Sequence, residues 1–154
     1  MSAKKQTKAD MWREFGLERP SSPRYEGLKG IYWRIFSEKR RKEDFEKYGT
    51  CISCGKRVNS WQDFDPGHFI PAGGGGFALL FHPQNVNGEC KRCNAFDEMH
   101  LFGYAEGLDE RYGPGTAERL KEMYNDAHFK GKITKEWGQV EYRARIAELL
   151  NTRN

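Results

Sequence analysis

The sequence contains no long apolar run. Hydrophobic residues make up 37% of the 154 residues, the mean hydropathy is −0.89, and no segment approaches the roughly 20 apolar residues of a membrane-spanning helix. The basic residues near the N-terminus are not followed by the apolar stretch of a secretory signal. These absences argue against a membrane partner. We expect a polar, cytoplasmic protein of one compact domain, or of a small core with an arm.

The sequence also lacks repeats and a recognisable phosphate-binding loop. It shows no internal repeat and no coiled-coil heptad. The run Gly73–Gly76 is not followed by the Lys-Ser/Thr ending of a P-loop, and it does not join a strand to a helix. Four glycines give the chain great conformational freedom. We therefore predict a mobile connection there, and not a phosphate cradle.

Positive charge is concentrated at one end of the chain. Residues 1–50 carry 13 Lys/Arg and 8 Asp/Glu, residues 51–100 carry 4 and 5, and residues 101–154 carry 9 and 9. The basic excess therefore lies before the first cysteine. A basic segment is attracted to nucleic acid by counterion release, although a solvated helix face explains the charge equally well. Charge alone nominates DNA as a partner without selecting it.

Only four cysteines occur, and they form two C-x-x-C pairs, Cys51/Cys54 and Cys90/Cys93. Two thiolates at this spacing bind one ion from a tight turn, and two such turns complete a tetrahedral Zn²⁺ site. Two disulfides would need an oxidising compartment, and a redox pair would leave the other pair unexplained. Buried free thiols are a further alternative. We predict one structural zinc ion, which supplies much of the folding free energy in so small a domain.

We expect an α+β protein in four parts. They are a flexible basic arm at residues 1–22, an amphipathic basic helix at 23–49, a zinc-containing core at 50–112 and a C-terminal helical extension at 113–154. The arm is polar and proline-interrupted, with one helical turn around residues 11–15. The long helix is predicted to start at Ser22-Pro23, to carry an apolar stripe and to end at Gly49.

Short strands and three further helices are expected after the long helix. One strand is predicted within Trp61–Ile70 and a second at either Leu79–Phe81 or Asn85–Asn87. Apolar residues then recur at helical spacing in three stripes. Their members are Leu101, Tyr104, Ala105, Leu108 and Tyr112; Leu120, Met123, Tyr124 and Ala127; and Trp137, Val140, Ala144 and Ala147. Thr116 and Thr134 are predicted to cap the second and third of these helices. The stripes favour core packing over a cofactor site.

Polar residues between and beside the cysteine pairs form a more specific pattern. Asp65-Pro66-Gly67-His68 lies between the pairs, Asn85 precedes the second pair by five residues, and Asn94 follows it directly. Taken singly, a histidine is most often an ordinary hydrogen-bonded side chain, Asp-Pro-Gly a turn, and an asparagine after a cysteine a helix cap. Their order and spacing, bracketed by four thiols, indicate a site.

This arrangement resembles the HNH, or His-Me finger, endonucleases. Within that class, the segments Cys51–Gly55, Asp65–Ile70 and Asn85–Asn94 most resemble the phage NinG/Rap recombination protein family, over about residues 31–150. The junction-resolving endonuclease VII of T-even phages is similar in design. The resemblance implies a ββα-metal (HNH) nuclease core within residues 50–112 and a structural zinc ion. It also implies Mg²⁺- or Mn²⁺-dependent cleavage of branched DNA, such as Holliday junctions and D-loops, in the bacterial host of a phage or prophage.

The residue types suit phosphodiester hydrolysis. His68 is predicted to act as the general base at neutral pH. Asp65 and Asn94 are oxygen ligands suited to one Mg²⁺ or Mn²⁺ completed by water and substrate phosphate. The resemblance implies that Asn85 is the structural asparagine whose amide holds the hairpin loop. The ligand set stays open, because other residues lie close enough in sequence to replace or join these: Asp63, Glu98 and His100.

Basic residues on the long helix and in the second cysteine pair are the expected DNA contacts. They are Lys39, Arg40, Arg41, Lys42, Lys91 and Arg92. A DNA junction has two-fold character, so a homodimer is expected. One alternative function is a non-catalytic, zinc-stapled module that binds DNA or RNA. Another is an interaction protein that uses the apolar stripe of the long helix.

Overall fold

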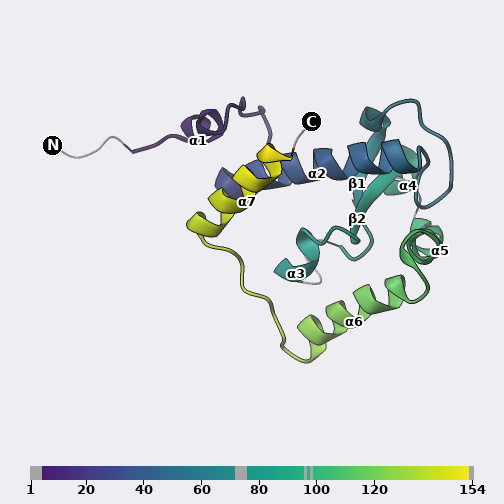
Figure 1. Ribbon diagram of the computed structural model, residues 1–154. Coiled ribbons are helices and arrows are strands. Elements are labelled where there is room, and N and C mark those ends of the chain that lie inside the picture. The colour runs from purple at the N-terminus through teal and green to yellow at the C-terminus, as the bar shows by residue number, and fades with distance from the viewer. Residues whose placement is uncertain (1–4, 72–75, 96, 98, 153–154) are drawn as a thin grey trace. The chain divides into compact units, whose positions relative to one another are not determined.

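The computed structural model describes residues 5–71, 76–95, 97 and 99–152 (Figure 1). Most of the predicted mobile glycine run lies outside the described residues. By its internal contacts the chain divides into two units, Met1–Phe36 with Trp137–Asn154, and Ser37–Glu136. The four-part division expected from the sequence stays a prediction.

The described residues form helices and one two-stranded antiparallel sheet. The helices are α1 (Lys8–Glu14), α2 (Gly27–Lys47), α3 (Phe77–Leu80), α4 (Lys91–Ala95), α5 (His100–Tyr112), α6 (Thr116–Phe129) and α7 (Gln139–Asn151). The strands are β1 (Phe64–His68), which follows a 3₁₀ turn at Trp61–Asp63, and β2 (Val86–Cys90). The α+β class is therefore confirmed. None of the described helices combines the length and the apolar character needed to span a membrane.

Helix α1 forms within the segment predicted to be an arm. Thr7 and Asp10 make a capping box, in which the Thr7 hydroxyl accepts from Asp10 N at 3.1 Å and the Asp10 carboxylate accepts from Thr7 N at 3.0 Å. These hydrogen bonds lower the pKa of Asp10 to about 2. Trp12 is fully buried, so the single helical turn expected here is a capped helix with a buried aromatic anchor.

Helix α2 begins at Gly27, and the predicted start at Ser22-Pro23 is wrong. Gly27 has a φ of +68°, a left-handed conformation that suits glycine. The carbonyl of Tyr25 lies against the first turn, where a Cβ on Gly30 would overlap it. The chain before Gly27 thus folds back over the helix and does not extend it. The predicted end is confirmed, because Gly49 follows the last turn with a φ of +70°.

In the first unit, α7 packs an aromatic face against the first half of α2. The Tyr142 and Tyr32 rings lie 6.3 Å apart. The stripe predicted for α7 is out of phase, because the aromatic ring takes the buried position ahead of smaller residues. The buried residues of α7 are Tyr142 and Ile146, and the exposed ones include the predicted Val140, Ala144 and Ala147. Gly138 precedes the helix, so the predicted cap at Thr134 is also wrong.

In the second unit, β1 and β2 lie side by side and α4 continues directly from β2 (Figure 1). The register pairs Asp65 with Glu89 and Gly67 with Asn87, so these four residues share one face of the hairpin. β1 lies within the predicted segment. β2 overlaps the predicted Asn85–Asn87 and not Leu79–Phe81, since the leucines at 79 and 80 are buried in the short helix α3.

Helices α5 and α6 build the core of the second unit. Their predicted stripes are confirmed in part, since Tyr104, Leu108, Leu120 and Ala127 are buried. Thr116 is the first residue of α6 and not its cap; Gly115 takes the cap position, and the Thr116 hydroxyl donates to the Gly113 carbonyl at 2.7 Å. The core cluster consists of Ile52, Phe69, Ile70, Leu79, Tyr104, Leu108, Ala117 and Leu120. Two of its members, Phe69 and Ile70, directly follow β1, so the core anchors the end of the strand that carries the predicted site.

Candidate metal centres and the site around the hairpin

The four cysteine side chains converge at the end of the hairpin. Cys90 is the last residue of β2 and Cys93 lies in α4, while Cys51 and Cys54 belong to the loop that follows α2. All four sulfur atoms lie within 4.8 Å of one another, and none is in a disulfide. Cys51, Cys90 and Cys93 are buried and Cys54 is exposed. Two loops far apart in sequence therefore present one compact donor set.

The spacing of the sulfur atoms fits a tetrahedral metal. With Zn–S bonds of about 2.3 Å, tetrahedral geometry places neighbouring sulfur atoms about 3.8 Å apart. The Sγ atoms of Cys54 and Cys90 are 3.8 Å apart, whereas a disulfide requires about 2.0 Å. The backbone N–H of Cys90 also donates to Sγ of Cys51 at 3.2 Å. The four cysteines are thus positioned to bind a structural metal such as zinc.

Burial favours the protonated form of two of the four thiols. Burial raises the pKa of Cys51 to about 11 and also raises the pKa of Cys93. Burial acts in the same direction on Cys54, but hydrogen bonds, of which that with the Lys56 backbone is the largest, outweigh it and lower the Cys54 pKa. A metal ion must therefore displace protons when it binds here.

Helix α5 meets the first cysteine loop with no side chain between the two backbones. A Cβ added at Gly103 would overlap the carbonyl oxygen of Ser53, and one added at Gly107 would overlap that of Ile52. These glycines lie four residues apart on one face of α5. The loop that holds two of the thiols is therefore seated directly on the helix.

Asp65 and Asn94 lie together, as the sequence predicted for a shared ligand pair. The Asn94 amide donates from Nδ2 to Oδ2 of Asp65 at 3.1 Å. Lys91 pairs with the other carboxylate oxygen at 2.8 Å. Asp63, the alternative to Asp65, accepts from the backbone N–H groups of Asn59 and Ser60, each at 3.1 Å. Its carboxylate caps the 3₁₀ turn, so the geometry favours Asp65 as the ligand.

His68 ends strand β1 with its ring oriented by a backbone carbonyl. Its Nε2 lies 3.0 Å from the carbonyl oxygen of Leu80. A carbonyl only accepts, so Nε2 donates, and a neutral ring then carries its lone pair at Nδ1. The preceding residue, Gly67, faces Asn94, whose Oδ1 lies 3.2 Å from the position of an added Cβ. Chain geometry then brings the His68 Cα within roughly 9 Å of that oxygen.

Asn85 holds the loop between the strands through three buried hydrogen bonds. Its Oδ1 accepts from Ile70 N at 2.8 Å, and its Nδ2 donates to the carbonyls of Ile70 and Leu79 at 3.0 and 2.9 Å. The side chain is fully buried. This geometry matches the loop-holding role that the resemblance implies.

Tyr104 is a site residue that the sequence presented only as part of an apolar stripe. Its hydroxyl donates to the Gly67 carbonyl at 2.6 Å and accepts from the Asn87 amide at 3.1 Å. The ring is fully buried, and burial raises its pKa well above the ordinary value. It therefore stays a neutral donor and fixes the backbone next to His68.

Glu89 was also missed, although it lies directly across the hairpin from Asp65. It is fully buried, and its Oε2 accepts from Ser53 Oγ and from His100 Nδ1, each at 2.5 Å. Burial raises its pKa, and these two hydrogen bonds oppose that rise. His100, an alternative ligand, is thus paired with Glu89. Glu98 lies outside the described residues. The available signal was an acidic residue directly before Cys90, two positions beyond the strand predicted at Asn85–Asn87.

The predicted DNA-contacting residues fall into three groups. Arg40 is buried with 8% of its surface exposed, so its prediction as a DNA contact is wrong: the guanidinium satisfies buried acceptors. These are Pro83 O, Val86 O, Asp44 Oδ1, Asn87 Oδ1 and Tyr112 Oη. Arg41 and Lys42 lie over the Trp61 ring at 4.9 and 5.0 Å. Lys39 is half-buried, and Lys91 and Arg92 are exposed on α4.

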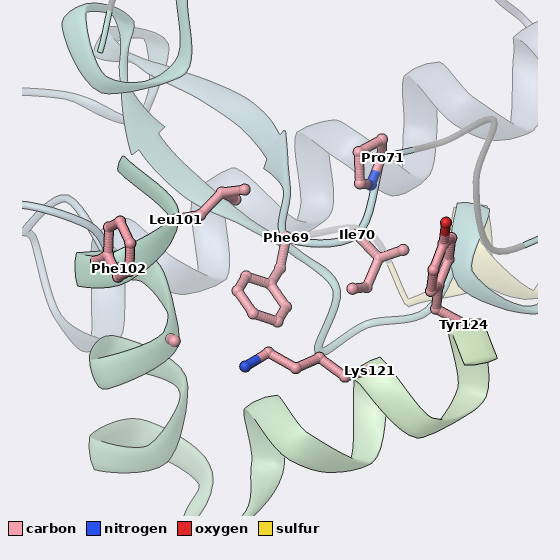
Figure 2. A pocket seen from close by; sticks show the side chains of 8 residues that line it. Phe69, Ile70, Pro71, Leu101, Phe102, Lys121 and Tyr124 are labelled. Carbon is pink, nitrogen blue, oxygen red and sulfur yellow. The ribbon is translucent and has the colours of Figure 1, made fainter. Parts of the chain in front are cut away.

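An apolar pocket opens on the chain directly after His68. Figure 2 shows Phe69 and Ile70 facing the space between α5 and α6, with the Lys121 side chain extending below the Phe69 ring. The pocket has a volume of about 390 Å³. Its other lining residues are Pro71, Leu101, Phe102, Ala105 and Tyr124. Aromatic walls beside one ammonium group suit a flat ligand that carries negative charge nearby.

The comparisons with known proteins bear on the family. No curated protein and no solved structure matches the chain. The family described as Bacteriophage Lambda NinG protein matches residues 25–152, which include both cysteine pairs, the hairpin and all helices from α2 onward. This match confirms the family resemblance drawn from the cysteine pairs and the residues between them. The chain belongs to the bacteriophage lambda NinG protein family.

Proposed function

We propose that the chain is a metal-dependent DNA endonuclease with an HNH-type ββα-metal core. It cuts phosphodiesters of branched DNA, such as Holliday junctions and D-loops, during phage recombination in the cytoplasm of the bacterial host. One zinc ion on the four cysteines is structural, because four thiolates leave no open coordination position. One Mg²⁺ or Mn²⁺ serves the reaction.

The observation that carries this proposal is the contact between Asp65 and Asn94, whose Nδ2 donates to Asp65 Oδ2 at 3.1 Å. They come from a strand and from the helix that follows the second strand, and their oxygens suit a hard divalent cation. His68 lies three residues along the same strand as Asp65. Its ring is held by the Leu80 carbonyl, so the basic nitrogen does not depend on the substrate for its orientation.

The chain's own residues suit an in-line displacement at phosphorus. His68 accepts a proton at Nδ1 from the attacking water, whose oxygen forms the new bond to phosphorus as the bond to the leaving oxygen breaks. A divalent ion held by Asp65 and Asn94 supplies positive charge for the pentavalent phosphorus and the leaving oxygen. The solvent returns a proton to the leaving oxygen.

Surface residues near the hairpin account for DNA binding. Lys91 and Arg92 are exposed on α4 beside Asp65, and Lys39, Arg41 and Lys42 extend the basic surface along α2. The pocket that Phe69 lines between α5 and α6 offers aromatic surface for a base that is unstacked at a branch point. A homodimer presents two such sites, which matches the two-fold symmetry of a four-way junction.

Cleavage of labelled DNA tests the proposal. A four-way junction and a linear duplex of the same sequence are incubated with zinc-loaded protein and Mg²⁺, Mn²⁺ or EDTA. We expect metal-dependent cutting of the junction, reduced at least about 100-fold in His68→Ala. His128→Ala, which changes an exposed histidine on α6, is the matched control and keeps wild-type activity. Sedimentation with and without junction reports the dimer.

The alternative, a non-catalytic zinc-stapled binding module, predicts a different outcome. Wild-type protein would then bind the DNA panel without cutting it under any divalent metal. Equal cleavage by His68→Ala and wild type would instead remove His68 from the mechanism. Zinc content and circular dichroism of each variant show whether a loss of activity is a loss of fold.

A further inference from the structure

Glu89 is a buried carboxylate that the hydrogen bonds of the hairpin leave half satisfied. None of its surface is exposed, and a buried carboxylate is stable only when it is paired. Ser53 and His100 both bind the same oxygen, Oε2. The other oxygen, Oε1, is buried and has no hydrogen-bond partner in the part of the chain that the structure describes. A native protein rarely tolerates such an atom without a further partner.

The unpartnered oxygen points at the Asp65–Asn94 pair. A Cβ added to Gly67 would overlap Oε1 of Glu89 and would lie 3.2 Å from Oδ1 of Asn94. Both oxygens therefore face the same small space over Gly67. Asp65 pairs with Glu89 across the two strands, so its side chain lies on the same face of the hairpin. Glycine at position 67 is what leaves this space open.

We propose that Oε1 of Glu89 is a third protein ligand for the divalent cation, beside Asp65 and Asn94. This inference rests on the proposed function. Two carboxylates and one amide oxygen balance the charge of one Mg²⁺ or Mn²⁺ and leave positions for water and a phosphate oxygen. Ser53 and His100 hold the opposite oxygen, as hydrogen-bonded partners commonly orient a metal-binding carboxylate. Ser53 lies between Cys51 and Cys54, so the loop that holds these two thiols also positions the Glu89 carboxylate.

Direct measurement of Mn²⁺ binding tests the assignment without relying on activity. Zinc-loaded wild type, Glu89→Gln and Glu106→Gln are titrated with Mn²⁺, and the free ion is followed by electron paramagnetic resonance. Glutamine keeps the shape of the side chain and removes its charge. We expect Mn²⁺ affinity to fall at least about tenfold in Glu89→Gln. Glu106 is exposed on α5, so Glu106→Gln binds Mn²⁺ as wild type does.

A second variant separates ligation from folding. Ser53→Ala removes one hydrogen bond to Oε2 and leaves every proposed ligand in place, so we expect Mn²⁺ affinity to fall by about tenfold, less than in Glu89→Gln. Zinc content and the thermal midpoint, measured without Mn²⁺, show that each variant is folded. If Glu89→Gln does not fold, wild-type Mn²⁺ affinity in Ser53→Ala overturns the proposal.

The outcomes also separate this inference from the proposed function. Wild-type Mn²⁺ affinity in folded Glu89→Gln, together with loss of binding in Asp65→Asn, overturns the role of Glu89 and leaves the metal site intact. Absence of Mn²⁺ binding and of cleavage by the wild-type protein overturns the metal site itself, and Glu89 with it.

Discussion

Replacing Arg40 by alanine tests whether its guanidinium stabilises the fold or contacts DNA. In the structure it makes five hydrogen bonds of 3.0 Å, and its side chain and that of Asp44 are 9% and 2% exposed. Removing one partner of a buried ion pair destabilises a protein by about 3–5 kcal/mol. Two carbonyls also lose a donor, but the penalties overlap, so we expect a loss of about 4 kcal/mol.

That loss is large beside the roughly 5–15 kcal/mol that stabilises a typical domain. For a chain of this size, it lowers the melting temperature by about 8–16 °C. Urea unfolding followed by circular dichroism, at fixed free zinc, measures the change. Arg41→Ala is the matched control, because Arg41 stacks on an aromatic ring, an interaction that contributes about 0.5–1 kcal/mol at exposed sites.

DNA binding by the same two variants completes the test. The folded fraction of Arg40→Ala is expected to bind a junction as well as wild type does, because the guanidinium does not reach the surface. If Arg40→Ala has wild-type stability and weakened DNA affinity, the reasoning is refuted. Arg40 would then be a DNA contact, as its place in a basic run suggested.

Four further predictions concern the site. Zinc binding releases protons, because burial raises the Cys51 pKa to about 11; zinc affinity therefore rises with pH, as calorimetry in buffers of different ionisation enthalpy measures. Asn85→Ala leaves three buried backbone groups without their hydrogen-bond partner. We therefore expect it to lower the free energy of unfolding, measured in urea, by at least about 3 kcal/mol. Gly67→Ala places a methyl group against Oε1 of Glu89, so Mn²⁺ affinity falls while zinc content is kept. Phe102→Ala opens the pocket wall and weakens binding of a junction more than of a linear duplex, as fluorescence anisotropy reports.

The sequence predicted the elements whose signals are local. The two C-x-x-C spacings predicted the cysteine cluster, since each pair needs only one tight turn to present both sulfur atoms. Gly49 predicted the end of α2, because a left-handed residue stops a helix. Asp65 and Asn94 were predicted as neighbours from their places beside the cysteine pairs, and the hairpin joins them.

What the sequence did not predict depends on contacts between distant segments. Arg40 reads as one member of a basic run, and most of the acceptors that explain its burial lie far along the chain, in β2, the turn before it and α5. Tyr104 fits an apolar helix stripe, yet its hydroxyl is needed 37 residues away at Gly67. Leu79 looks like part of a strand until the core that buries it is known. In each case the deciding partner is far away in the sequence.

The direct seating of α5 on the first cysteine loop makes metal uptake a reporter of tertiary assembly. Where Gly103 and Gly107 lie against carbonyl oxygens, no layer of side chains can absorb a misfit, so the shape of the loop and the docking of the helix depend on each other. A larger residue at either position should leave every thiol chemically intact and still yield protein that retains little zinc. Loss of zinc would then report that α5 had failed to dock, although the substituted residue is not a zinc ligand.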